Sequence, residues 1–197
     1  MILNIHGYNS TGENSKFHYL KSIFPQENII SPTLPFNPKD TVEQLKSIIL
    51  KQKEKILVVG SSLGGFYAYY IAARFSLNVC LINPSLIPFV NLVDRILEQN
   101  QTSGSEQVSI EQLKELRDLF SLSYLEADKK HVNVFVSNDD DVINHQAVTK
   151  KMSPFFNQYQ EFETGGHRFE DLSLLDNYIV KLYENCTGLQ PDPAPFK

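Results

Sequence analysis

A short glycine- and serine-rich segment contains the first residues that could do chemistry. Gly60-Ser61-Ser62-Leu63-Gly64 fits the pattern Gly-x-Ser-x-Gly, and it lies between the apolar run Ile56–Val59 and a helical stretch that starts near Phe66. At such a strand-to-helix turn the chain bends so sharply that the serine backbone is strained and its hydroxyl projects above the sheet, so the flanking positions need glycine. The pattern therefore predicts Ser62 as a nucleophile for acyl transfer.

A serine hydroxyl is a poor nucleophile at neutral pH and needs a histidine base that a carboxylate orients. In this class of site the acid and then the histidine follow the serine, each on a loop after a strand. We favour Asp140 as the acid because Asp141-Val142-Ile143 follows it, and we interpret Asp139 and Asp141 as a solvated turn and a helix N-cap. His167 comes after two glycines and precedes the final helix, which predicts it as the base.

Three other histidines compete with His167 by residue type alone. His145 lies at a predicted helix start and is close in sequence to Asp140, whereas His131 begins a strand and His18 lies in an early amphipathic stretch. We predict all three as surface histidines. We interpret His6, which follows the first strand, as a residue that braces its loop.

Acyl transfer also needs hydrogen-bond donors for the oxyanion that forms on the acyl carbonyl. One donor is expected from the residue after the nucleophile and the other from a loop after an early strand. Leu63 supplies the first backbone N–H. The loop His6-Gly7-Tyr8 follows the first strand, so we predict the backbone N–H of Tyr8 as the second donor.

The elements that must position these residues follow from the apolar pattern. Short apolar runs alternate with amphipathic stretches, which is typical of βαβ units around a parallel sheet buried on both faces. We predict a three-layer α/β fold, with a mostly parallel sheet flanked by helices. The predicted strands are Ile2–Ile5, Ile29–Ile30, Ile56–Val59, Val79–Ile82, Val132–Val136 and Tyr159–Phe162.

Two helices are marked by residues at their ends. Thr41, with Gln44 three residues later, predicts the N-cap of one helix. Gly188 predicts the end of the final helix, after which the Pro-rich stretch 191–195 is expected to be extended. The apolar positions of the two helices are Val42, Leu45, Ile48 and Ile49, and Leu172, Leu175, Ile179 and Leu182.

The interval of about residues 85–130 departs from this rhythm. It predicts a small, cap-like helical insertion within a single domain that spans residues 1–197. Ser109 with Gln112 predicts a capping box at the start of one helix, and Leu92, Ile96 and Leu97 indicate another, with a polar turn containing Gly104 between them. At the start of the insertion, three residues are candidates either for lining an acyl pocket or for packing the insertion onto the sheet: Leu86, Ile87 and Phe89.

Composition narrows the classes of partner. The formal net charge of -5 and the pI near 5.5 argue against nucleic acid, whose binders need clustered Lys and Arg. The apolar runs are too short to span a membrane, and the N-terminus lacks the pattern of a secretory signal, so we expect a cytoplasmic protein. Cys80 and Cys186 are interpreted as a buried small residue and a free thiol. We expect no metal and no cofactor.

Several blocks together resemble one known family. Their joint spacing is similar to that of the YqiA/YcfP-like small bacterial esterases of the α/β-hydrolase superfamily. The resemblance implies a minimal α/β-hydrolase fold and hydrolysis of carboxylesters or acyl thioesters. The blocks are His6–Ser10, Val59–Ala68, Leu81–Phe89 and Gly165–Phe169.

The chain departs from this family in two places. Members have Gly-Asp-Glu-Val where this chain has Asn138–Val142, and they have a residue between the glycines and the histidine that is absent here. The first departure leaves Asp139 open beside Asp140 as the acid, and the second bears on the placement of His167.

The leading hypothesis is a serine hydrolase with the triad Ser62, Asp140 and His167, acting on a small acyl ester or thioester. A binding protein on a hydrolase scaffold is the alternative from another class, since a fold does not dictate function. It would not react with serine-directed phosphonates. An acyltransferase is a closer alternative, distinguished by its product when an alcohol or thiol acceptor competes with water.

Overall fold

The computed structural model describes residues 1–99, 108–126 and 131–186. Six strands form one sheet, in which every neighbouring pair runs parallel. All six predicted strands are confirmed, and the described part of the sheet is entirely parallel. In spatial order the strands are β2 (Ile29–Ile30), β1 (Ile2–Ile5), β3 (Leu57–Ser62), β4 (Asn78–Pro84), β5 (Val132–Ser137) and β6 (Gln158–Phe162).

The strand order reverses between β1 and β3. The chain runs from β1 outward to β2, and it then returns to the other side of β1 and continues from β3 towards β6. Ile5 at the end of β1 is paired with Gly60 of β3, so the segments that follow the two strands leave the sheet side by side. In open parallel sheets, ligands bind beyond the carboxyl ends of the strands at such a reversal.

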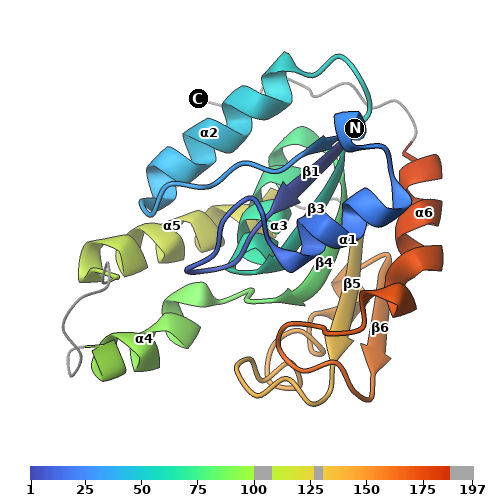
Figure 1. Cartoon of the computed structure of the whole chain (residues 1–197). Helices are drawn as coiled ribbons and strands as arrows, with labels where there is room; N and C mark the ends of the chain where they lie inside the picture. The colour runs from blue at the N-terminus through green and yellow to red at the C-terminus, as the bar shows by residue number, and fades with distance from the viewer. Residues whose placement is uncertain (100–107, 127–130, 187–197) are drawn as a thin grey trace.

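Successive residues of a strand point to opposite faces of the sheet, and the strands therefore contribute to two apolar cores. Val58 and Leu81 belong to one core, and Val59 and Ile82 to the other. Helices on both faces give three layers, as Figure 1 shows, which confirms the predicted architecture. The first core lies under α2 (Pro38–Lys51), α3 (Leu63–Phe75) and α5 (Ile110–Glu126), and the second under α1 (Ser15–Ile23) and α6 (Asp176–Glu184).

In the described part of the interval between β4 and β5 there are two helices. The helix predicted around Leu92 is α4 (Pro88–Gln99), which packs against α5. Because α5 also packs against α2 and α3, it covers the sheet as part of the crossover between two parallel strands. The polar turn predicted at Gly104 lies outside the described residues. Among the described residues there are also three short 3-10 helices: η1 (Gln26–Asn28), η3 (Ser153–Phe155) and η4 (Leu172–Leu175).

The prediction of Thr41 as an N-cap is wrong. The helix α2 begins one turn earlier, at Pro38, because the side chain of Asn37 accepts hydrogen bonds from two backbone amides of the first turn. Proline fits the first helical position, where its missing N–H has no helical partner to lose. Thr41 is a buried residue inside the helix, and its hydroxyl donates to the carbonyl of Pro35 over 2.8 Å.

Two other helix ends were also predicted. The capping box is confirmed, because the N–H of Ser109 donates to the side chain of Gln112 over 2.7 Å and the N–H of Gln112 donates to the hydroxyl of Ser109 over 3.2 Å. The final helical stretch starts as η4, continues as α6 and ends at Glu184, earlier than predicted. Gly188 and the Pro-rich stretch lie outside the described residues.

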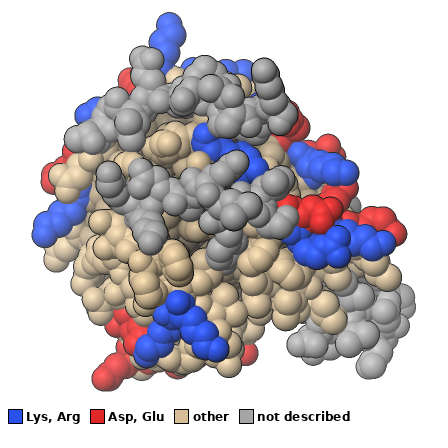
Figure 2. Space-filling model, turned by 180° about the vertical axis from the view of Figure 1, so that it is seen from behind, with Lys and Arg blue, Asp and Glu red and all other residues tan. Residues whose placement is uncertain are grey.

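The surface carries mixed charge. Figure 2 shows that Lys and Arg lie beside Asp and Glu along both sides of the face seen from behind. None of the helices among the described residues combines the length and the apolar character that crossing a membrane requires. Cys80 and Cys186 are both free and buried, as the sequence predicted for a disulfide-free pair.

Candidate active site

Ser62 lies at the turn from β3 into α3. Its backbone angles are φ 53° and ψ -124°, in the left-handed region that non-glycine residues rarely adopt. Two glycines let the chain pass through this turn. A Cβ on Gly60 would lie 2.5 Å from the carbonyl oxygen of Gly64, and a Cβ on Gly64 would lie 2.1 Å from the carbonyl oxygen of Ile5. The predicted sharp turn is therefore present, and both flanking positions require glycine.

Three side chains meet at the carboxyl edge of the sheet, at the ends of β3, β5 and β6. The hydroxyl oxygen of Ser62 lies 3.1 Å from Nε2 of His167. Nδ1 of the same ring lies 3.0 Å from each carboxylate oxygen of Asp140. A neutral His167 protonated at Nδ1 donates to Asp140 and leaves Nε2 free to accept the hydroxyl proton of Ser62.

The carboxylate of Asp140 is almost completely buried, with 1% of its side chain exposed. Burial raises the pKa of this carboxyl, but hydrogen bonds from His145 and His167 and from two loop amides outweigh it. The net effect holds the pKa of Asp140 well below its usual range. Asp140 is therefore an ionised carboxylate at neutral pH, able to orient an imidazole and to stabilise its protonated form.

The hydrogen bonds of Asp139 are made with groups other than the ring of His167. Its exposed carboxylate accepts a hydrogen bond from the N–H of Gly166 over 2.7 Å and another from the hydroxyl of Ser137. Between Asp139 and Asp140, the structure thus brings only Asp140 to the histidine ring. Asp139 instead braces the loop that carries the ring. Asp141 is exposed, and its predicted role as a helix N-cap is wrong because turns follow it and Asp140 itself accepts the two amides.

The prediction of His145 as a surface histidine is wrong. Its side chain is 3% exposed, Nε2 lies 2.9 Å from Asp140, and Nδ1 lies 3.0 Å from the hydroxyl of Thr149. A neutral ring protonated at Nε2 satisfies both contacts, donating to Asp140 and accepting from Thr149. Two histidines therefore share one carboxylate. Among the described residues, no group of three or more His, Cys, Asp or Glu is arranged to hold a metal ion.

We expect His145→Leu to lower kcat by roughly 10- to 30-fold with little change in KM. This factor corresponds to about 1.5–2 kcal/mol, the lower part of the range for a hydrogen bond to a charged group. His145→Gln is the matched control, because its side-chain amide can still donate to Asp140, and its kcat should stay within about threefold of wild type. Steady-state kinetics over a range of pH measure both variants. Equal losses in the two variants would show that only packing at this position matters.

The loop that carries His167 is held by two further buried residues. The side-chain amide of Asn83 donates to the carbonyl of Gly166 over 2.8 Å and to the carbonyl of His167 over 3.1 Å. The ammonium group of Lys16 donates to the carbonyl of Arg168. Burial and the nearby charge of Arg168 lower the pKa of Lys16 to about 8. Sequence reasoning assigned neither Asn83 nor Lys16 a role, since no motif marks residues that act through backbone carbonyls.

His6 braces the loop after β1, as predicted. Its Nδ1 lies 2.8 Å from the carbonyl of Gly7, and its Nε2 accepts the N–H of Leu34 over 2.9 Å. Both ring nitrogens are therefore used in the neutral form with Nδ1 protonated. The adjacent segment Gly7-Tyr8 runs beside the nucleophile, since a Cβ on Gly7 would lie 3.1 Å from Cβ of Ser62.

The brace at His6 makes folding sensitive to acid. Burial lowers the pKa of His6, and its hydrogen bond to Gly7 opposes only part of this shift. As the pH falls through 6.5, His6 therefore takes up a proton in the unfolded chain while it is still neutral in the folded chain. The contribution of neutral His6 to the free energy of unfolding is thus fully present above pH 6.5 and is lost as the pH falls through the lower pKa of the folded state. His6→Gln keeps an acceptor for the N–H of Leu34 but does not titrate. We expect its melting temperature to fall less than that of wild type between pH 7.5 and pH 5. Equal losses in thermal melts would contradict this.

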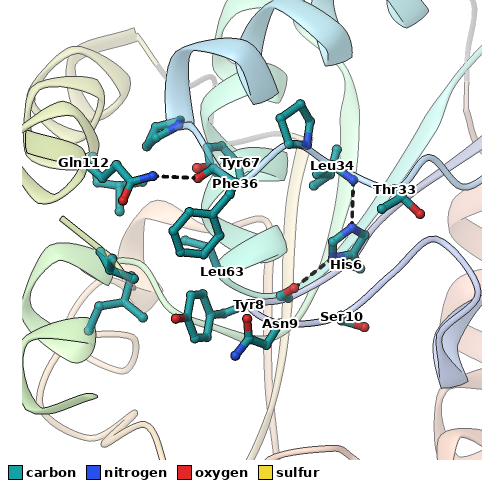
Figure 3. A pocket seen from close by; sticks show the side chains of 16 residues that line it. His6, Tyr8, Asn9, Ser10, Thr33, Leu34, Phe36, Leu63, Tyr67 and Gln112 are labelled. Carbon is teal, nitrogen blue, oxygen red and sulfur yellow. Dashed lines mark hydrogen bonds between the residues drawn. The ribbon is translucent and has the colours of Figure 1, made fainter. Parts of the chain in front are cut away.

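Two cavities flank the segment Gly7–Ser10. One is a polar groove of about 830 Å³ that contains Ser62 and His167 and is also lined by Lys16. The other is an apolar cavity of about 250 Å³ beside Leu63, shown in Figure 3. Neither is lined by Leu86, Ile87 or Phe89, the predicted substrate-binding residues. Leu86 lies in the core, and the ring of Phe89 packs on Phe120 at 5.3 Å, so the packing interpretation fits these two residues.

The parallel sheet between two helical layers, with a sharp strand-to-helix turn at the end of β3, defines the α/β-hydrolase fold. Solved α/β-hydrolase structures superpose on the whole arrangement. A monoacylglycerol lipase from Paleococcus ferrophilus matches 93% of this chain and 93% of its own, with a TM-score of 0.67 and 13% identity. The mouse alpha/beta hydrolase domain-containing protein 10 matches 93% of this chain and 89% of its own, with a TM-score of 0.58 and 16% identity.

The chain belongs to the uncharacterised protein family UPF0227, whose family model matches residues 1–184. The protein YcfP of Escherichia coli O9:H4, a UPF0227 member, is 24% identical over 180 residues, which cover 88% of this chain and 93% of YcfP. The resemblance to the YqiA/YcfP-like family is therefore confirmed.

Proposed function

We propose that this protein is a serine hydrolase that cleaves carboxylesters or acyl thioesters through an acyl-enzyme intermediate on Ser62. The observation that carries the proposal is the unbroken chain of contacts from Ser62 through His167 to the buried Asp140, with distances of 3.1 and 3.0 Å. The fold shared with lipases and the strained turn at Ser62 support it.

In the first half-reaction, the hydroxyl oxygen of Ser62 attacks the acyl carbonyl carbon while Nε2 of His167 takes the hydroxyl proton. The backbone amides of Leu63 and Tyr8 are proposed to donate to the oxyanion. Asp140 stabilises the imidazolium that forms. When the tetrahedral intermediate collapses, the carbon–oxygen or carbon–sulfur bond to the leaving group breaks, and the leaving alcohol or thiol takes the proton from His167.

In the second half-reaction, His167 takes a proton from water as the water oxygen attacks the acyl-enzyme. Collapse of this intermediate releases the carboxylic acid, and His167 returns the proton to Ser62. The groove at Ser62 opens to solvent and contains charged side chains, which suits the entry of water and of a polar leaving group.

Reaction with a fluorophosphonate tests the proposal directly. The purified chain is incubated with the reagent, and the site of modification is read by intact mass and peptide mapping. Single labelling at Ser62, together with turnover of p-nitrophenyl acetate, is the expected result. A folded protein with neither labelling nor turnover would favour the binding-protein hypothesis. Product analysis with a competing alcohol or thiol separates a hydrolase from an acyltransferase.

A further inference from the structure

The apolar cavity beside Leu63 is built from four separate parts of the chain. Tyr8 comes from the loop after β1, Phe36 from the loop before α2, and Tyr67 from α3 (Figure 3). The fourth part, between β4 and β5, supplies Leu92, Val108 and Leu116, each less than 9% exposed. Protein interiors are close-packed, and an apolar space of about 250 Å³ between well-buried side chains is typical of a binding site for an apolar group.

The walls of this cavity are fixed by direct contacts. The side-chain amide of Gln112 on α5 donates to the carbonyl of Phe36 over 3.3 Å, so α5 is tied to the loop before α2. The rings of Tyr8 and Phe36 lie with centroids 5.8 Å apart. The contact of His6 with the N–H of Leu34, drawn in Figure 3, holds the opposite wall. The space is therefore present before any ligand binds.

The cavity lies next to the nucleophile. It is lined by Leu63, which follows Ser62 in the chain, and by Gly7, whose backbone runs against Ser62. Gly7 and Tyr8 line both this cavity and the polar groove that contains Ser62 and His167. A carbonyl held between the amides of Leu63 and Tyr8 would thus have a polar space on one side and an apolar space on the other.

We propose that this cavity binds the acyl chain of the substrate, while the leaving group lies in the polar groove. The proposal rests on the proposed hydrolase function and names its substrate class: esters or thioesters of unbranched, medium-length fatty acids. At roughly 30 Å³ for a methylene group, about the volume of a water molecule in the liquid, 250 Å³ holds a chain of about eight carbons. Residues of the loop before α2 and of α4 and α5 set this length.

The test uses the purified full chain and p-nitrophenyl esters from acetate to decanoate, so that only the acyl chain varies. Each methylene buried in an apolar site raises kcat/KM by up to about fourfold, so kcat/KM should rise up to about octanoate and then stop rising. Val108→Phe and Leu92→Phe fill part of the cavity, and each should lower the octanoate-to-acetate ratio of kcat/KM by about tenfold, the contribution of roughly two methylenes.

Leu119→Phe is the matched control. Leu119 also lies on α5 and packs partly buried against the same core, but it does not line the cavity. Its octanoate-to-acetate ratio should equal that of wild type. A wild-type profile that is flat from acetate to octanoate would overturn the proposal. The proposal would also be overturned if Val108→Phe and Leu92→Phe had the same octanoate-to-acetate ratio of kcat/KM as the control.

A second series, acetates of alcohols of increasing length, tests the opposite arrangement. If Val108→Phe changes the profile of this series and leaves the acyl series unaltered, the cavity binds the leaving group and the proposal is wrong. The failure of the underlying function has a different signature, since wild type would then turn over no ester, acetate included, and would not be labelled at Ser62.

Discussion

Replacement of Ser62 by alanine is expected to lower kcat for p-nitrophenyl esters by about 10⁴-fold or more. The variant lacks the oxygen that His167 contacts at 3.1 Å, so no acyl-enzyme can form. The residual rate would come from the oxyanion donors and from substrate binding, which remain in place. Burst kinetics and steady-state turnover measure the loss, and fluorophosphonate labelling should disappear with it.

A loss of activity in Ser62→Ala is informative only if the protein stays folded. Alanine has the same Cβ as serine, and the melting temperature should therefore remain close to that of wild type. Ser22→Ala is the matched control, because Ser22 is an exposed serine on α1 whose hydroxyl donates to the carbonyl of Tyr19. It should retain full turnover and full labelling. Wild-type turnover in Ser62→Ala would refute the proposed mechanism.

The sheet could be predicted because its strands are buried on both faces and read as short, unbroken apolar runs. The apolar runs predict where each strand lies, but they do not predict the residue at which it ends. β3 continues to Ser62 and β4 to Pro84, past the apolar residues, because backbone pairing persists into the turn at Ser62. The start of α2 differs from the prediction because Thr41 fits a capping pattern, whereas Asn37-Pro38 carries the stronger signal one turn earlier.

The meeting of Ser62, Asp140 and His167 could be predicted because the three residues follow strands in the order expected for a triad. The hydrogen bond of His145 to Asp140 could not be predicted, since the closeness of the two residues in the sequence argues against it. The carboxylate of Asp140 accepts the amides of Val142 and Ile143, which turns the chain back and brings His145 to it. The apolar cavity could not be predicted from the sequence, for a related reason. Its walls come from segments far apart in the sequence, and no local pattern brings Phe36 and Leu116 together.

Asp140→Asn is expected to lower kcat by about 10⁴-fold, the scale known for the same change in serine proteases. The amide removes the charge that stabilises the imidazolium, and it can hold His167 in the tautomer whose Nε2 is protonated and cannot accept from Ser62. Asp139→Asn keeps an oxygen that can accept a hydrogen bond from the N–H of Gly166, and its kcat should fall by less than about tenfold. Similar losses in the two variants would contradict the assignment of Asp140 as the acid.

Combining the changes at Asp140 and His145 tests how the two residues act together. If His145 acts only through the carboxylate, then His145→Leu should lower kcat further by less than about threefold once Asp140 has become asparagine, although it costs roughly 10- to 30-fold in the wild-type background. Independent losses that multiply would mean that His145 influences the site by another route, such as the packing of its loop. The double-mutant cycle on kcat therefore separates a histidine that positions the acid from one that only fills space.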